Sequence, residues 1–170
     1  MDVGTSLALT FAYGLFGTVQ SAIMGAASRA RGGREASLIM PLGAAPILAA
    51  LLLLIALDEG QTKLSAPLDT ALAFSGLVLL CGAVLWLTIR GLPRWVGLAG
   101  VVSIWLVLAP RLIADLGLAL YVSTFTLGSC ASALAFDHFG VFGTARRAVT
   151  APRLGGLALV GVGVILVRVA

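Results

Sequence analysis

Six apolar segments, separated by short polar or charged stretches, dominate the pattern of this chain. They cover residues 4–27, 36–57, 68–89, 95–108, 112–136 and 154–167. About 20 apolar residues in helical form cross the roughly 30 Å hydrocarbon core of a bilayer. The first, second, third and fifth segments reach that length, whereas the fourth and sixth are shorter. The pattern predicts an all-α integral membrane protein, a compact bundle of six transmembrane helices that forms a single domain over residues 1–170.

The composition supports the same fold class. Hydrophobic residues make up 60% of the 170 residues and charged residues only 11%, and the mean hydropathy is +1.10. A soluble domain carries about a quarter charged residues. The chain is therefore too poor in charge to cover a water-exposed surface.

The positive charges alternate between the segments in a way that indicates one orientation. If all six segments cross, the stretches after the first, third and fifth lie on one side of the membrane. That side holds eight basic residues: Arg29, Arg31, Arg34, Arg90, Arg94, Arg146, Arg147 and Arg153. The other side holds three: Lys63, Arg111 and Arg168. Because short cytoplasmic loops are rich in Lys and Arg, we expect loops 28–35, 90–94 and 137–153 in the cytoplasm, both termini outside, and the chain in the cytoplasmic (inner) membrane.

Several function classes are disfavoured by the sequence. The net charge is only +4 and lies at helix ends, where topology and anionic lipid headgroups explain it better than nucleic acid does. Cys81 and Cys130 fall within apolar segments without metal-ligand spacing. Ser129 lies nine residues before His138 on the same predicted helix, too far for a catalytic pair. We therefore expect no enzyme activity, no metal and no cofactor.

Small residues at every fourth position predict where helices touch. Gly17, Ser21 and Gly25 show this spacing in the first segment, and Gly128 and Ser132 show it in the fifth. In lipid, helices associate through close contact of small residues. Such faces are common in multi-span proteins and indicate packing rather than a particular function.

Polar side chains within the apolar segments are candidates for ligand contacts, because each carries a desolvation cost in the membrane. Gln20 and Tyr13 in the first segment, with Tyr121 and Thr124 in the fifth, form our predicted substrate-binding set. They would hydrogen-bond a polar or amphipathic molecule in an apolar pocket. Hydroxyl groups can instead bond to a carbonyl of the preceding turn, so the purely structural interpretation stays open for the threonine.

Two ionisable groups are open to two interpretations each. Asp115, early in the fifth segment, is the only carboxylate placed inside the membrane by this pattern. It is either a helix N-terminal carboxylate favoured by the dipole and by Arg111, or a proton or cation site. His138, the single histidine, follows Asp137 and either caps a helix end or titrates near neutral pH.

Several runs of residues resemble a known family. They are Gly17-Thr18-Val19-Gln20, Pro93-Arg94-Trp95-Val96-Gly97-Leu98-Ala99-Gly100, Ala109-Pro110-Arg111-Leu112, Asp137-His138-Phe139-Gly140 and Arg153-Leu154-Gly155-Gly156. Together they resemble the YdcZ-like branch of the drug/metabolite transporter (DMT) superfamily over about residues 1–57 and 93–170. The Asp-His-Phe-Gly motif is the most specific of them.

The resemblance implies a half-size transporter, similar to one repeat of the ten-span EamA-type members. Such halves are expected to pair, as homodimers or with a sister chain, around a substrate pathway between inverted repeats. The chain is also similar to the small multidrug resistance proteins. It lacks the glutamate of their first helix, and Gln20 in the corresponding helix cannot carry a proton.

One segment departs from that family pattern. Members of the YdcZ-like branch resemble five-span proteins. Relative to that pattern, residues 68–89 of this chain would be an additional span. If residues 68–89 did not cross, five basic residues would lie on one side of the membrane and six on the other. Such an even split would suit a chain that inserts in both orientations and forms an antiparallel dimer. The charge count favours six helices over the alternative of five.

The leading hypothesis is a transporter or transporter half that moves a small polar or amphipathic metabolite. The alternative is a non-transporting membrane subunit that assembles with a larger membrane complex. A lipid-modifying enzyme is a distant third. In every case the partners are the lipid bilayer and another membrane protein or a second copy of the chain, with no nucleic acid.

Overall fold

The structure, a computed structural model, describes residues 1–59, 70–92, 96, 100, 102 and 104–169. Throughout this part of the chain the regular structure is helical, as predicted. The helices are α1 (Val3–Arg31), α2 (Gly33–Glu59), α3 (Ala71–Thr88), α4 (Ile104–Leu116), α5 (Leu118–Phe139), the short 3₁₀ helix η2 (Val141–Gly143) and α6 (Ala151–Val169).

Four of these helices are long and apolar enough to cross a membrane: Val3–Arg31, Gly33–Ile55, Leu118–Phe139 and Ala151–Val169. They contain between 19 and 29 residues, and a rise of about 1.5 Å per residue makes each of them about as long as the hydrocarbon core is thick, or longer. The stretch Leu72–Thr88 in α3 is apolar but shorter. The predicted class, a helical integral membrane protein, is confirmed.

The break between the fourth and fifth segments was predicted in the wrong place. The sequence favoured a break near Pro110, but α4 runs through Pro110 to Leu116. The chain breaks instead at Gly117, whose φ of 76° is open to glycine and strained for other residues. Asp115 therefore lies at the end of α4 and not at the start of α5. Most of residues 95–103, the first part of the predicted fourth span, lie outside the described residues.

The first predicted cytoplasmic loop is also shorter than expected. Helices α1 and α2 are separated by Gly32 alone, which has a φ of 87°. Arg29, Arg31 and Arg34 consequently lie on helical turns. Arginine is a good helix former, so a helix can continue past the end of its apolar stretch.

The described chain divides into two compact units. One contains Met1–Ala22 with Trp105–Ala170, and the other contains Ile23–Ile104. Helix α1 contributes its first part to the former and its last part to the latter. That residues 1–170 form one transmembrane domain stays a prediction.

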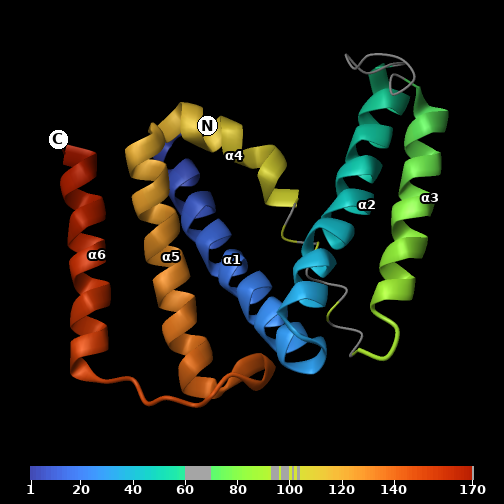
Figure 1. Ribbon diagram of the computed structural model, residues 1–170. Helices are drawn as coiled ribbons and strands as arrows, with labels where there is room; N and C mark the ends of the chain where they lie inside the picture. Colours follow the sequence, from blue (N-terminus) through green and yellow to red (C-terminus); the bar gives the residue numbers. More distant parts are fainter. Residues whose placement is uncertain (60–69, 93–95, 97–99, 101, 103, 170) are drawn as a thin grey trace. The chain divides into compact units, whose positions relative to one another are not determined.

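In the 23–104 unit, α2 and α3 pack side by side (Figure 1). The side chain of Thr70 caps the N-terminus of α3 by accepting from the backbone N–H of Ala73. The guanidinium of Arg31 donates to the carbonyl oxygens of Thr88 and Arg90 at the other end of α3. A cation is favourable at this end of a helix, where unpaired carbonyl groups and the helix dipole converge.

Candidate functional site

The other unit is built around a very close crossing of α1 and α5. A Cβ atom placed on Gly14 would lie 3.0 Å from the Cα of Gly128 and would overlap the carbonyl oxygen of Phe125. Ser129 Oγ donates to the Gly14 carbonyl at 3.1 Å, and Thr18 Oγ1 donates to the Ser129 carbonyl at 3.0 Å. The crossing thus combines small residues with interhelical hydrogen bonds, as helix pairs in lipid commonly do.

The prediction of contact faces was only partly right at this crossing. Gly128 is in contact as expected, but its partner is Gly14, which the every-fourth-residue pattern of the first segment did not include. A Cβ on Gly17 would instead meet the ring of Phe125 at 3.2 Å. Gly14 and Gly17 lie three residues apart, so a search for both three- and four-residue spacings would have included Gly14.

Helices α1 and α5 run in the same direction within this unit (Figure 1). Near the start of α1, Ser6 contacts Asp115, which lies just before α5. One to two turns beyond the crossing, an apolar groove of about 410 Å³ lies between the two helices. Its lining residues are Leu15, Phe16, Val19, Ala131, Ser132, Ala135 and Phe136. The start of α1 thus faces the start of α5, and the later part of α1 faces the later part of α5, as expected for parallel helices.

Aromatic rings from three helices converge next to the crossing. Tyr13 of α1 stacks on Trp105 of α4 with ring centroids 5.9 Å apart, and packs edge-on against Phe125 of α5 at 5.0 Å. Phe16 also stacks on Trp105, at 5.7 Å. Tyr121, one turn before Phe125 on α5, stacks on it at 6.5 Å. The structure therefore brings Tyr13 and Tyr121 onto the same phenylalanine ring.

Phe125 and Trp105 were not predicted as members of this cluster. Phe125 lies four residues after Tyr121, which is the spacing of side chains on one helix face, so a pattern was present. Trp105 lies on a third helix, α4. Its contact with Tyr13 depends on how α4 is placed, which no local pattern of residues indicates.

Thr124 is the predicted site residue with the most unusual surroundings. It is 4% exposed and lies on the face of α5 that also carries Leu120 and Gly128. Its Oγ1 is buried and has no hydrogen-bond partner among the described residues. Other hydroxyls in the same unit bond back to the preceding turn, as Thr10 does to Ser6 and Thr126 does to Val122. An unpaired buried hydroxyl costs about 1–3 kcal/mol, so this atom has hydrogen-bonding capacity that the described residues leave unused.

Gln20 lies further along the same face of α1 as Tyr13. The two residues are seven positions apart, or about two turns and roughly 10 Å along the axis. Gln20 is half-buried. All four predicted substrate contacts therefore belong to one unit, but Gln20 is set apart from the aromatic cluster. Their role in binding stays a prediction.

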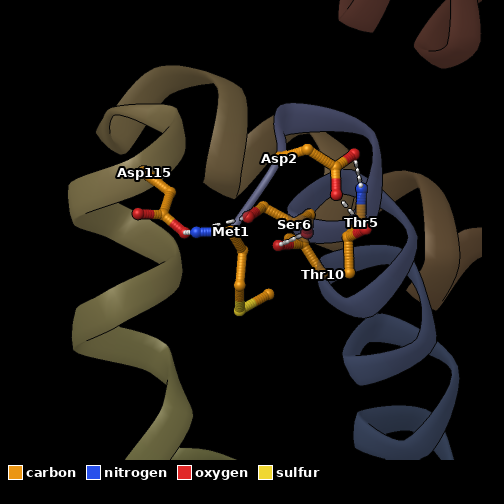
Figure 2. A network of polar contacts seen from close by, with 6 residues as sticks. All are labelled: Met1, Asp2, Thr5, Ser6, Thr10 and Asp115. Carbon is orange, nitrogen blue, oxygen red and sulfur yellow. Dashed lines mark hydrogen bonds and ion pairs between the residues drawn. The ribbon is translucent and has the colours of Figure 1, made fainter.

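Asp115 belongs to a separate polar network at the N-terminal end of α1 (Figure 2). Ser6, which is fully buried, donates from Oγ to Asp115 Oδ2 at 3.0 Å. The terminal amino group of Met1 lies 3.8 Å from the same oxygen. Thr5 donates to Asp2 from its hydroxyl and its backbone N–H, and these hydrogen bonds hold the pKa of Asp2 below its usual value.

The expected reason for the location of Asp115 was wrong. The carboxylate lies at the C-terminal end of α4, where the helix dipole disfavours a negative charge. In the described part of the chain, its partners are Ser6 and the Met1 amino group rather than Arg111. Whether Asp115 also binds a proton or cation stays a prediction.

The Asp137-His138-Phe139-Gly140 motif forms the turn that ends α5. Gly140 has a left-handed conformation, with φ 68° and ψ 36°, and its N–H bonds to the Phe136 carbonyl. Asp137 forms an ion pair with Arg153 of α6, and its carbonyl accepts from the N–H of Arg147. The motif therefore connects α5 to α6. His138 is exposed, and its ring lies against Phe139 rather than against the carboxylate.

The described residues contain no group of three or more His, Cys, Asp or Glu side chains that could hold a metal ion. Both cysteines are free: Cys81 is half-buried on α3, and Cys130 is exposed on α5.

Comparison with known proteins gives one match. A family model described as "Putative inner membrane exporter, YdcZ" matches residues 62–166. No curated protein and no solved structure matches the chain. The matched range includes residues 68–89, which the resemblance had set apart from the family, and it does not include residues 1–61.

This match covers more than half of the chain and includes α3, α4, α5 and most of α6. The description of the family names an exporter and no enzymatic activity. Together with the long apolar helices, the match assigns the protein to the inner membrane as a multi-pass membrane transporter. The chain belongs to the YdcZ family of inner membrane exporters.

Proposed function

We propose that this chain is one half of an exporter that moves a small polar or amphipathic metabolite out of the cytoplasm. The observation that carries the proposal is the unpaired Thr124 hydroxyl, which is buried on α5 beside the residues of the aromatic cluster. Tyr13, Tyr121 and Thr124 contribute contacts near the α1–α5 crossing, and Gln20 contributes one further along α1.

The chemistry of these groups favours an amphipathic substrate. Aromatic faces from Tyr13 and Phe125 offer apolar contact area, and tyrosine hydroxyls add polar ends. Ligand sites in proteins are typically apolar with a few placed polar groups. A strongly hydrated ion would find too few partners here, whereas a molecule with a ring or short chain and one or two polar groups fits.

The orientation in this proposal follows the charge distribution. The arginine-rich stretches 28–35, 90–94 and 137–153 face the cytoplasm and the termini face outward. The parallel course of α1 and α5 supports the six-span arrangement behind this orientation, because two parallel spans require an odd number of crossings between them. Six spans satisfy that condition, and the five-span arrangement does not.

The transporter would act as an oligomer with a second copy or a sister chain. No residue of α6 is buried, and Leu159 is 73% exposed on it. Helix α6 therefore offers a large apolar surface to lipid or to another subunit. The same observation supports the alternative function, a non-transporting subunit of a larger membrane complex.

Substitution of Thr124 by valine separates the two functions. Valine has nearly the shape of threonine, and it removes a hydroxyl that has no partner, so we expect stability to be unchanged or slightly increased. A transporter that uses this hydroxyl should lose export. Export is measured by untargeted mass spectrometry of the medium from cells that express the wild type, the variant or no protein.

The matched control is T126V on the same helix. Thr126 is exposed, and its hydroxyl bonds to the Val122 carbonyl, so this variant should retain export. If T124V leaves every wild-type-dependent metabolite in the medium unchanged, Thr124 is not a substrate contact. If the wild type adds no metabolite to the medium at all, the subunit function is the better one.

A further inference from the structure

An open, groove-like cavity lies between α5 and α6, outside the site proposed above. Its volume is about 290 Å³. Its lining residues are Cys130, Ala133 and Leu134 from α5 and Arg153, Gly156, Leu157 and Val160 from α6. The spacings of three, four and seven residues show that each helix contributes one face. A Cβ placed on Gly156 would have no atom within 4 Å, so the missing side chain leaves open space there.

Arg153 supplies a positive charge with spare hydrogen-bonding capacity at this cavity. Its Nη2 pairs with Asp137 Oδ2 at 2.5 Å. Its Nη1 is buried and has no partner among the described residues. Guanidinium groups carry five N–H donors in a fork that matches two anionic oxygens. An additional oxygen anion beside Arg153 would satisfy the donor that Asp137 does not reach.

The residues near this cavity carry more positive charge than the single carboxylate of Asp137 neutralises. Residues 137–153 contain Arg146, Arg147 and Arg153 but a single carboxylate, Asp137. The N–H of Arg147 bonds to the carbonyl of Asp137, and the side chain of Arg146 lies beside Gly140. All three arginines are therefore anchored close to the turn between α5 and α6, where they would attract an anion.

The rest of the cavity is apolar. From Arg153, the lining continues to Gly156 and Val160 over about two helical turns, or roughly 10 Å. Nearby positions on α6 are open to lipid, since Leu154 is 51% exposed and Leu159 is 73% exposed. The occupant that fits is a molecule with an anionic head and an apolar chain that enters from the bilayer.

We propose that this cavity binds an anionic phospholipid. The phosphate lies against the guanidinium of Arg153, and the start of an acyl chain follows Ala133, Gly156 and Val160. Basic pockets between membrane helices are a recognised way of holding anionic headgroups. The site is separate from the aromatic cluster, and it does not depend on which metabolite is exported.

The test uses the full chain purified in detergent and titrated with phosphatidylglycerol or phosphatidylcholine, with bound lipid counted by native mass spectrometry. We expect phosphatidylglycerol to bind at least about tenfold more tightly. Both lipids carry the phosphate, but the choline cation of phosphatidylcholine would be repelled by Arg146, Arg147 and Arg153. A second readout is the rate at which N-ethylmaleimide modifies Cys130. Bound lipid should slow that reaction, while Cys81 in the other unit serves as an internal reference.

Two variants examine the site in different ways. R153Q removes the charge and should lose the preference for phosphatidylglycerol, whereas R168Q removes one charge at the opposite end of the same helix and should retain it. G156L keeps Arg153 but fills the open space at Gly156. It should weaken lipid binding. G156L therefore tests the site independently if R153Q proves too unstable to purify.

Three results would overturn the proposal. The first is equal affinity for the two lipids, and the second is unchanged lipid preference in R153Q or unchanged binding in G156L. The third is equal protection of Cys130 by glycerol 3-phosphate at the same concentration, which would show a free-anion site instead of a lipid site.

Discussion

Gly14 of α1 and Gly128 of α5 face each other so closely that neither position has space for a side chain. This contact determines how far α1 and α5 approach, and so it determines which of their other side chains meet. Tyr13, next to Gly14, reaches Phe125, which lies three residues before Gly128. The crossing is therefore the structural basis of the candidate site as well as of the helix pair.

Alanine at either glycine should destabilise the protein. In G14A the new methyl group would overlap the Phe125 carbonyl, and in G128A it would overlap the Phe11 carbonyl. Overpacking of this kind costs about 1–3 kcal/mol, and the helices must separate to relieve it. Thermal unfolding in detergent, followed by tryptophan fluorescence, should show a lower midpoint for both variants.

The control for the crossing is G163A. Gly163 is also a helical glycine, but a Cβ there would have nothing within 4 Å. Because alanine favours helix over glycine, G163A should be as stable as the wild type or slightly more stable. An unchanged unfolding midpoint in G14A would contradict the close crossing of α1 and α5.

Replacement of Gln20 by leucine should reduce export without reducing stability. Leucine is well accommodated in a membrane helix and leaves no polar group to satisfy. The proposed pathway, however, would lose its only side-chain amide. Export is measured in the medium as for Thr124, and the amount of folded protein is measured by size-exclusion chromatography in detergent.

S21A is the companion variant for Gln20. Ser21 is the next residue on α1, is exposed, and bonds to the carbonyl of Gly17, so its loss should leave export intact. Equal export by Q20L and the wild type would remove Gln20 from the pathway. A loss of folded protein in Q20L would instead assign Gln20 a structural role.

The hydropathy of the chain was sufficient to predict its helices and its class, but not every helix end. Proline is expected to end a helix, yet Pro110 lies inside α4. In membrane proteins, neighbouring groups can satisfy the carbonyl that a proline frees. The break occurs at Gly117, because its positive φ turns the chain between α4 and α5.

The candidate site was only partly predictable, for a different reason. Polarity within an apolar segment made Tyr13, Tyr121 and Thr124 candidates for binding, and their role stays a prediction. Their relation to Phe125 and Trp105 depends on the register of α1 against α5, which is set by the Gly14–Gly128 contact. Likewise, sequence does not distinguish Thr124 from Thr126. The difference lies in which hydroxyl bonds back to the preceding turn.

Arg31 should contribute to stability through its contacts with the end of α3. Its guanidinium donates to the carbonyls of Thr88 and Arg90, and R31Q would leave these acceptors without a cation. The side chain is partly exposed, so the expected loss is about 1 kcal/mol rather than the full value of a charged hydrogen bond. Thermal unfolding and the rate of proteolysis at residues 89–92 measure the effect.

R34Q is a matched control for Arg31. It removes one positive charge three residues away, so it changes the charge bias that sets membrane orientation by the same amount. Unlike Arg31, however, Arg34 is exposed. R34Q should unfold like the wild type. If the two variants lost the same stability, the effect would come from local charge and not from the contacts of Arg31 with α3.

The parallel course of α1 and α5 restricts the number of spans. Helix α2 is long enough to cross, so α3 and the segment that leads into α4 must either both cross or both stay on one side. The distribution of arginines favours two crossings. We therefore expect a cysteine at position 62 to be accessible from outside intact cells and a cysteine at position 92 to be inaccessible.

The measurement uses T62C and L92C, which leave every arginine and lysine in place, in a background with C81S and C130S. A membrane-impermeant maleimide is added to cells before and after permeabilisation. D2C should label from outside, and A145C should label only after permeabilisation, as references for the two sides. Labelling of both test positions from outside would show that α3 does not cross. Partial labelling of all four positions would show mixed orientations, and an antiparallel dimer would then replace the arrangement proposed here.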